Sequence, residues 1–244
     1  RSRQKMHSVK RFQIHYVWPI LIVLIVLFLI LFFVLNIPFN TQEDLILLQP
    51  FPGAVNLSSC GTLNANGTYV LNQNLVSAGS CLHVNASNVV VDGLNLYKIT
   101  GPGSAGSIGV LVDRNNAVIK NLNISNFGSN VAIRGANISL VENNNFFYSS
   151  LVEINLSFSS NNIIRNNIFI NNTLDGVAIH NGGSNLIESN TFLGNGATVA
   201  PVPKAVYLYN DADNNIIKNN IIKSSYNGIV LFSNKGNKII GNDI

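Results

Sequence analysis

The chain has 244 residues, of which 47% are hydrophobic and only 11% are charged, and its formal net charge is +4. Five of its 15 basic residues precede residue 12, so the rest of the chain carries sparse charges of both signs and no basic surface that could follow a phosphate backbone. Nucleic acid is therefore excluded as a partner, and two cysteines are too few for a disulfide-rich scaffold.

An uncharged apolar stretch covers residues 17–35 and is interrupted only by Pro19. As a helix it would measure about 28 Å, close to the thickness of a bilayer's hydrocarbon core, so it predicts a transmembrane helix. The basic flank of residues 1–16 precedes it and two acidic residues follow it, which places the N-terminus in the cytoplasm and the later residues at the cell surface. The alternative is a cleaved signal peptide, but the stretch is too long and lacks a small-residue cleavage site.

The segments after the apolar stretch differ in composition. Residues 36–59 contain three prolines and predict a stalk, residues 60–87 predict an N-terminal lead-in to a repeat region, and residues 88–244 contain the repeats. The sequence has no initial methionine and stops inside a repeat, so we expect further coils after Ile244.

A nine-residue phrase recurs from residue 88 to the last residue. Its copies read NVVVDGLNL (88–96), NAVIKNLNI (116–124), ISLVENNNF (138–146), NNIIRNNIF (161–169), SNLIESNTF (184–192), NNIIKNNII (214–222) and GNKIIGNDI (236–244). A short β-rich unit that returns every 22 to 30 residues is typical of a solenoid in which each repeat forms one coil.

Three positions of the phrase predict columns along the solenoid, because stacked coils bring equivalent residues together at about 4.8 Å. Position four is Val91, Ile119, Val141, Ile164, Ile187, Ile217 and Ile239. Position nine is Leu96, Ile124, Phe146, Phe169, Phe192, Ile222 and Ile244. Both predict buried apolar ladders. Position seven changes from Leu94 and Leu122 to Asn144, Asn167, Asn190, Asn220 and Asn242, which predicts a ladder of stacked side-chain amides.

A second set of segments lies between the phrases and alternates with period two. They are GVLVD (109–113), NVAIR (130–134), LVEIN (151–155), GVAIH (176–180), AVYLY (205–209) and GIVLF (228–232). Their second and fourth residues are predicted to point inward and the third and fifth outward. Two strand types per coil, joined by Asn and Gly corners, predict an all-β right-handed parallel β-helix. A leucine-rich repeat is the rival, but its leucine spacing and helical periodicity are absent.

These repeats resemble those of the pectate-lyase-like superfamily, in particular its NosD-like and membrane-anchored prokaryotic surface proteins, whose units read N-x-x-I-x-N-N-x-I followed by G-I-x-L. The resemblance covers residues 88–244. It implies a parallel β-helix. It implies no single function, because the superfamily includes lyases, hydrolases, epimerases, adhesins and scaffolds.

The two cysteines, Cys60 and Cys81, lie in the predicted lead-in. The segments CGTL (60–63) and CLHV (81–84) resemble the first coil of many prokaryotic surface β-helices, and this resemblance, together with an exported location, implies a disulfide. Two free buried thiols are the alternative. The resemblance also invites a copper role, which the sequence opposes, since beyond the apolar stretch it offers only His83, His180, these cysteines and no methionine.

The outward residues of the second strand set predict a surface strip. One column reads Leu111, Ala132, Glu153, Ala178, Tyr207 and Val230, and its neighbour reads Asp113, Arg134, Asn155, His180, Tyr209 and Phe232. Aromatic faces beside planar polar groups suit a sugar ring, so we predict ligand binding at Arg134, Glu153, Asn155, His180, Tyr207, Tyr209 and Phe232. The alternative is that Asp113 pairs with Arg134, Glu153 joins them, and the aromatic side chains merely cover the sheet.

Catalysis finds weaker support. Arg134, Glu153 and His180 are candidate catalytic residues, but Glu153 has no partner carboxylate on the strip, as a glycoside hydrolase would need, and a lone exposed histidine such as His180 is more often only polar surface. Asp211 and Asp213 could hold calcium beside Asn210 and Asn214, although acids before such turns usually cap them. No other cofactor is indicated.

Seven N-x-S/T sequons predict glycosylation candidates on an exported protein. They begin at Asn56, Asn66, Asn85, Asn123, Asn137, Asn155 and Asn171. Taken together, the sequence predicts a membrane-anchored surface β-helix that serves as a scaffold or as a carbohydrate- or partner-binding module. The alternatives are a polysaccharide lyase or glycoside hydrolase, and a purely structural module of the cell envelope.

Overall fold

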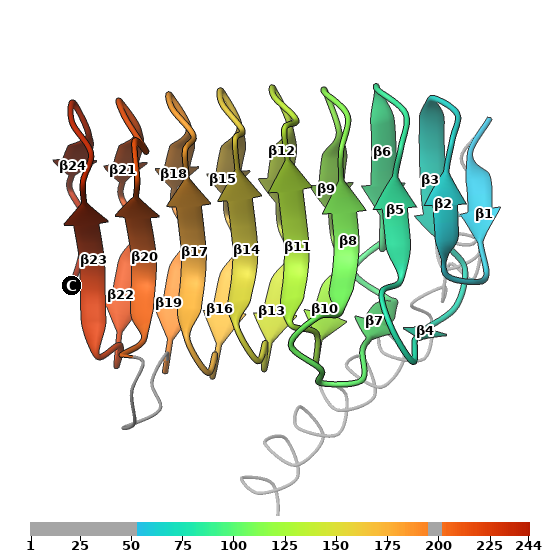
Figure 1. The fold of residues 1–244 in the computed structure, drawn as a ribbon. Coiled ribbons are helices and arrows are strands. Elements are labelled where there is room, and N and C mark those ends of the chain that lie inside the picture. The colour runs from blue at the N-terminus through green and yellow to red at the C-terminus, as the bar shows by residue number, and fades with distance from the viewer. Residues whose placement is uncertain (1–52, 195–201) are drawn as a thin grey trace, which may run out of the picture. The chain divides into compact units, whose positions relative to one another are not determined.

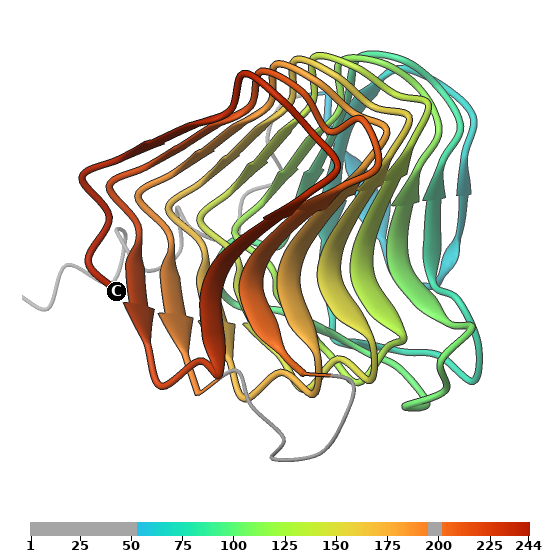
Figure 2. The same ribbon diagram turned by 60° about the vertical axis from the view of Figure 1, so that its left-hand side comes forward.

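The structure is a computed structural model that describes residues 53–194 and 202–244, which form a parallel β-solenoid (Figure 1). Successive coils stack in register, and each complete coil adds one strand to each of three sheets, as Figure 2 shows. The predicted transmembrane helix at 17–35 and its basic flank lie outside the described residues. Within the described ranges, no helix is both long and apolar enough to cross a bilayer.

The three sheets contain only parallel strand pairs. The nine-stranded sheet contains β1 (Val55–Leu57), β3 (Gly67–Leu71), β6 (Val89–Asp92), β9 (Val118–Lys120), β12 (Leu140–Glu142), β15 (Ile163–Arg165), β18 (Leu186–Glu188), β21 (Ile216–Lys218) and β24 (Lys238–Ile240). The eight-stranded sheet contains β2 (Gly61–Leu63), β5 (Leu82–Val84), β8 (Ile108–Val112), β11 (Ser129–Arg134), β14 (Val152–Ser157), β17 (Asp175–His180), β20 (Lys204–Tyr209) and β23 (Asn227–Phe232). The seven-stranded sheet contains β4 (Leu75–Val76), β7 (Lys98–Thr100), β10 (Asn123–Ser125), β13 (Asn145–Phe147), β16 (Ile168–Ile170), β19 (Thr191–Leu193) and β22 (Ile221–Lys223).

Each coil therefore has three strands, where the sequence predicted two. The recurring phrase is not one strand, because its sixth residue adopts a left-handed backbone conformation that turns the chain. Asn121, Asn143 and Asn166 have φ angles of 55°, 56° and 54°, which asparagine tolerates better than most residues. The corner splits the phrase into a strand of the nine-stranded sheet and a strand of the seven-stranded sheet. The described coils also begin ahead of the predicted lead-in, since β1 precedes Cys60.

The predicted apolar columns form the core. Position four is fully buried from Val91 to Ile217, and the position-nine rings of Phe146, Phe169 and Phe192 stack with centroids 5.2 and 4.5 Å apart. The prediction for Leu96 is wrong. This side chain is 59% exposed, and Ile99 takes its place beside Ile124, because the first copy of the phrase has a longer corner before β7.

The predicted asparagine ladder is confirmed. Asn144, Asn167, Asn190 and Asn220 are buried, and each Nδ2 donates to the Oδ1 of the next ladder residue at 2.9 to 3.1 Å. Each Nδ2 also donates to a main-chain carbonyl, as Asn167 does to Val141 at 2.9 Å. A second ladder, which the sequence analysis missed, consists of Asn162, Asn185, Asn215 and Asn237. Both ladders pair the buried carbonyl groups that the corners leave free.

The disulfide between Cys60 and Cys81 is confirmed. It joins the residue before β2 to the residue before β5, and therefore links the first two coils of the eight-stranded sheet. The cysteines are 21 residues apart in sequence. Closing a loop of that length contributes on the order of 3 kcal/mol to the stability of the fold. The contribution falls at β2, the edge strand of the described eight-stranded sheet, which pairs with β5 on one side.

Candidate functional site

The outer face of the nine-stranded sheet carries a column of charges that neutralise one another. The signs alternate through Asp92, Lys120, Glu142, Arg165, Glu188 and Lys218, which are in register from coil to coil. Three ion pairs result, with N···O distances of 3.3 Å for Lys120–Asp92, 2.7 Å for Arg165–Glu142 and 3.0 Å for Lys218–Glu188. Because every charge of the column has an opposite neighbour, this face offers little to an incoming ligand.

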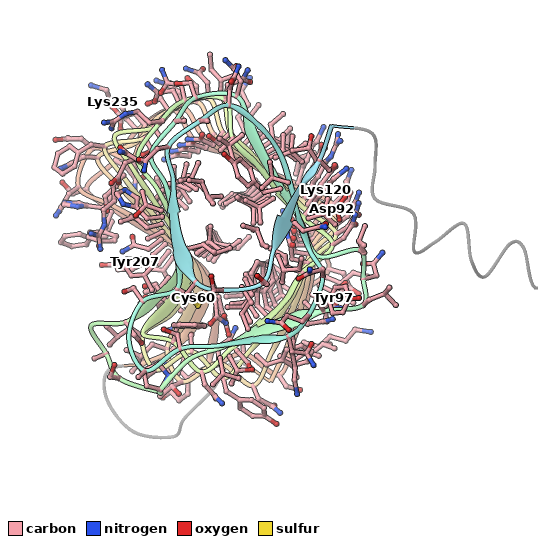
Figure 3. All side chains as sticks on the ribbon, turned by 90° about the vertical axis from the view of Figure 1, so that its right-hand side faces the viewer. Cys60, Asp92, Tyr97, Lys120, Tyr207 and Lys235 are labelled. Carbon is pink, nitrogen blue, oxygen red and sulfur yellow. A yellow bond between two sulfur atoms is a disulfide. The ribbon has the colours of Figure 1, made fainter. Side chains whose placement is uncertain are left out.

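The outer face of the eight-stranded sheet instead carries the aromatic strip, which we define as Phe158, His180, Tyr207, Tyr209 and Phe232. His180, Tyr209 and Phe232 end three neighbouring strands, β17, β20 and β23, and are in register. Figure 3 looks along the solenoid and shows Tyr207 pointing outward, on the side opposite to Asp92 and Lys120.

Four of the five rings of the aromatic strip are in contact, and Phe232 is in register with Tyr209 on the next strand. His180 stacks on Tyr209 with centroids 4.8 Å apart, and Tyr209 stacks on Tyr207 at 4.6 Å. Phe158, which directly follows β14, meets the His180 ring edge to face at 5.5 Å. The strip therefore runs along the solenoid axis over four coils. The sequence analysis did not predict Phe158 as part of the strip. Gly135 and Asn181 occupy the same corner in the coils before and after it, so a bulky residue at this position is a signal that the sequence contains.

Charged and polar neighbours hold the Tyr207 ring in place and raise the pKa of Tyr209. Lys204 Nζ lies 4.6 Å from the centre of the Tyr207 ring and 3.4 Å from Asp175 Oδ1. Burial, followed by the neighbouring Tyr207 and Asp175, raises the pKa of Tyr209 above its usual value. Its phenol therefore stays protonated at neutral pH and remains a hydrogen-bond donor. Burial also raises the pKa of Asp175, and Lys204 opposes that rise.

The predicted columns are wrong by two residues in one coil. Asn155 pairs with Ala132 and Ala178, so it belongs to the Tyr207 column, and Ser157 takes the predicted place of Asn155 beside Arg134 and His180. Period-two alternation cannot distinguish these registers. The residues at 152, 154 and 156 are all aliphatic, so a shift of two still places apolar side chains inside.

The same shift moves Glu153 from the surface to the interior, which contradicts its predicted roles. The side chain is completely buried, and it accepts hydrogen bonds from Asn130 Nδ2 and, at 3.2 Å, from the Ser149 backbone N–H. Burial raises the pKa of Glu153 to about 8, against the lowering effect of these hydrogen bonds. Glu153 is therefore neutral at pH 7 and cannot reach a ligand on the strip.

The other two candidate catalytic residues lie on the strip face, with Ser157 between them. Arg134 pairs with Ser157, and Ser157 pairs with His180. The alternative pairing of Arg134 with Asp113 is not observed, because Asp113 Oδ2 lies 2.8 Å from His83 Nε2. Arg134 is exposed, and it forms no salt bridge with the described residues. The arrangement presents a cation, a hydroxyl and an imidazole in one row.

Metal-ligating groups of the described residues are dispersed. Asp213 accepts a hydrogen bond from the Lys235 backbone at 2.8 Å and lies 3.7 Å from its Nζ, so it caps its turn. Asp211 is exposed on the same turn. Within residues 53–194 and 202–244 no three His, Cys, Asp or Glu side chains come close enough to hold an ion together.

The seven sequons differ in accessibility. Those at Asn56, Asn66 and Asn171 are exposed. Those at Asn85, Asn123, Asn137 and Asn155 are half-buried, and the first three use their amides in hydrogen bonds with neighbouring coils. A glycan attaches through an accessible side-chain nitrogen, so the exposed group is better placed for modification.

Comparison with known proteins identifies related sequences and folds. The family model described as "Periplasmic copper-binding protein (NosD)" matches residues 59–244. No curated protein matches the sequence significantly. Among solved structures, the chain is similar to the enzymatically active domain of tailspike protein 2 from bacteriophage CBA120, with 13% identity over 78% of this chain and 38% of that chain and a TM-score of 0.43.

Two further structures show the same level of similarity. The periplasmic alginate epimerase AlgG is 13% identical over 73% of this chain and 51% of that chain, with a TM-score of 0.41. An alginate lyase from Paenibacillus sp. str. FPU-7 is 14% identical over 78% of this chain and 99% of that chain, with a TM-score of 0.42. The chain thus spans about two fifths of the tailspike chain and half of the epimerase chain. At these identities and TM-scores the likeness assigns no activity or substrate to this chain.

Proposed function

Since the chain belongs to the NosD family, we propose that it is an extracytoplasmic β-helix protein that binds carbohydrate chains along the aromatic strip. The observation that carries this proposal is the unbroken contact of four rings over three coils, which Phe232 continues in register onto a fourth. A sugar ring has apolar C–H faces and a rim of hydroxyl groups. Aromatic side chains bury the faces, and the polar ends of Tyr209, His180 and Ser157 can bind the rim.

The strip also has the right direction for a polymer. Its rings follow the solenoid axis, with neighbouring coils about 4.8 Å apart, so successive sugar units of an extended chain can meet successive rings. Ala132 and Ala178 belong to the Tyr207 column, beside the column of His180 and Tyr209, and their small side chains leave space for a ligand there. A single small molecule would not need four coils of aromatic side chains.

Two observations and one general principle support an extracytoplasmic compartment. The family is described as periplasmic, the first two coils share a disulfide, and disulfides persist in oxidising compartments. We further propose that residues 17–35 anchor the protein in the plasma membrane, with residues 36–54 as a spacer before β1 and the solenoid outside. The membrane and a glycan are then its two partners.

The described residues do not fit the copper site that the family description suggests. Soft-ligand copper sites gather Cys, Met and His side chains. Here Cys60 and Cys81 are joined, His83 binds Asp113, and the His180 ring is stacked on Tyr209. The only methionine, Met6, lies outside the described residues. We therefore assign no copper chemistry to these coils.

Tyr209→Ala is expected to weaken glycan binding about tenfold or more, because it removes the central ring that contacts both His180 and Tyr207. The measurement is a glycan array with the purified full chain, followed by titration of the best ligand. Tyr207→Ala should also weaken binding, since Tyr207 is the next ring of the strip.

Tyr226→Ala is the matched control, because Tyr226 is exposed but is not part of the aromatic strip. It should leave the affinity unchanged. If no glycan binds, or if the Tyr209 and Tyr207 variants bind as well as the unchanged chain, the aromatic rings serve only to cover the sheet, and the protein is then a structural module.

A further inference from the structure

One coil uses bulky side chains at corners where the others use small polar residues. Most described residues with a left-handed backbone are Asn, Ser, Asp or Gly. Apart from Leu94 in an earlier coil, the exceptions gather between β11 and β15, where Ile138, Tyr148 and Phe158 have φ angles of 60°, 54° and 53°. Each is more than half exposed, so burial of its side chain does not compensate the strained backbone.

Strained backbone positions of this kind cluster at functional sites, so the position of each of the three side chains relative to the aromatic strip decides which of them can take part in binding. Phe158 is the one of these three residues whose ring meets the aromatic strip, through its edge-to-face contact with His180. Its backbone N–H donates to the His180 carbonyl at 3.0 Å, which fixes the turn beside the imidazole. Asn181 occupies the equivalent corner one coil later and has no ring to offer.

An exposed cation lies at the same end of the strip. Arg134 is separated from His180 by the hydroxyl of Ser157, one residue before Phe158. Lys204, the other cation beside the rings, is paired with Asp175. Asp113, the carboxylate nearest to Arg134 in register, is paired with His83. The arginine fork is thus available to a carboxylate from outside.

We propose that Arg134, Ser157, Phe158 and His180 form a subsite for a uronic acid unit, so that the glycan bound by this protein is an acidic polysaccharide. This inference rests on the proposed function of the strip. The ring of the sugar packs against Phe158, while its carboxylate accepts two parallel hydrogen bonds from the Arg134 guanidinium. The Ser157 hydroxyl, which lies between Arg134 and His180, donates to a carboxylate or hydroxyl oxygen of the same sugar unit.

The carboxylate requirement is tested with polygalacturonate and with the same polymer after reduction of its carboxyl groups to hydroxymethyl groups. The full chain should bind polygalacturonate about tenfold more tightly than the reduced polymer. Arg134→Gln should remove this difference and leave binding of the reduced polymer unchanged. Arg134→Lys should keep part of it, because the charge remains but the planar fork is lost.

The outcomes separate the inference from the proposed function. Equal binding of both polymers by the unchanged chain, with loss in Tyr209→Ala, would overturn the acidic subsite and leave the strip as a glycan-binding surface. A tenfold preference that survives in Arg134→Gln would also overturn the subsite. Binding of neither polymer, while another glycan binds through Tyr209, would again remove the uronate inference alone.

Phe158→Asn supplies a second, independent test. The substitution relieves the strained corner, so the melting temperature should rise while the affinity for polygalacturonate falls. Ile138→Asn and Tyr148→Asn relieve the same strain at corners that do not contact the strip. Both should raise the melting temperature without changing affinity. A Phe158→Asn variant that binds as tightly as the unchanged chain would show that this ring has no part in the subsite.

Discussion

Asn167→Leu is expected to lower the free energy of unfolding by about 3 kcal/mol, although Leu122 occupies the same column two coils earlier. The Asn167 side chain is buried and makes four hydrogen bonds. Its Nδ2 donates to Val141 O at 2.9 Å and Asn190 Oδ1 at 3.1 Å, and its Oδ1 accepts from both Asn144 N and Asn144 Nδ2 at 3.0 Å. Leucine leaves the Val141 carbonyl and the Asn144 N–H without these partners, and each such loss costs about 1–3 kcal/mol.

Chemical denaturation of the full chain, followed by circular dichroism, measures this loss. Asn166→Gly is the control, because Asn166 is the adjacent exposed residue with φ of 54°, which glycine adopts at no steric cost. It should change stability by less than about 1 kcal/mol. The double variant Asn144→Leu/Asn167→Leu should lose less than the sum of its single variants, since the two residues share two bonds. A fully additive result would contradict a ladder that acts as a unit.

The parts of the fold that repeat were predictable from sequence. Position four and the phenylalanines of position nine recur at a fixed place in each phrase, so their stacking follows once the coil is assumed. The same holds for the asparagine ladder. The alternating charge column at position five is equally evident in the sequence, since Asp92, Lys120 and Glu142 are the fifth residues of consecutive phrases.

The candidate site was predictable only in part, because it depends on where the period is broken. The strand before Phe158 could be placed in two registers, and the choice between them moves Glu153 from surface to core. The decisive signals were nonrepeating ones. Asn130, Glu153 and Gly176 occupy equivalent positions on three neighbouring strands. A Cβ added at Gly176 would lie only 2.7 Å from the Phe192 ring, so side chains at this position border the core.

The stability of the folded chain is expected to fall as the pH rises from about 4.5 to about 8, and the residue responsible is Glu153. Its pKa is about 8 in the folded state, against an ordinary value of 4.5 in the unfolded chain, so between these values the folded state retains a proton that the unfolded state releases. The stability that this proton provides is fully present below the unfolded pKa, and it is lost as the pH passes through the folded pKa.

The slope is about 1.4 kcal/mol per pH unit for one proton, so about 3 kcal/mol is lost by pH 7 and about 5 kcal/mol above pH 8. Glu153→Gln removes the titration. Its amide oxygen can accept from Ser149 N–H, and its NH2 group can donate to Asn130 Oδ1 once the Asn130 amide turns over, since this oxygen has no hydrogen-bond partner among the described residues. The variant should therefore match the unchanged chain near pH 4 and exceed its free energy of unfolding by about 3 kcal/mol at pH 7.

Denaturation curves of the full chain and of Glu153→Gln, taken from about pH 4 to about pH 9, give this difference directly, because the remaining titrating groups cancel. Glu188→Gln is the matched control. It removes a partly exposed glutamate paired with Lys218, and it should change stability by less than about 1 kcal/mol. Glu153→Gln should also leave glycan binding intact, since the side chain is buried behind the strip. Parallel curves for the variant and the unchanged chain across this range would show that Glu153 is ionised in the folded state, and a loss of binding would return it to the surface site.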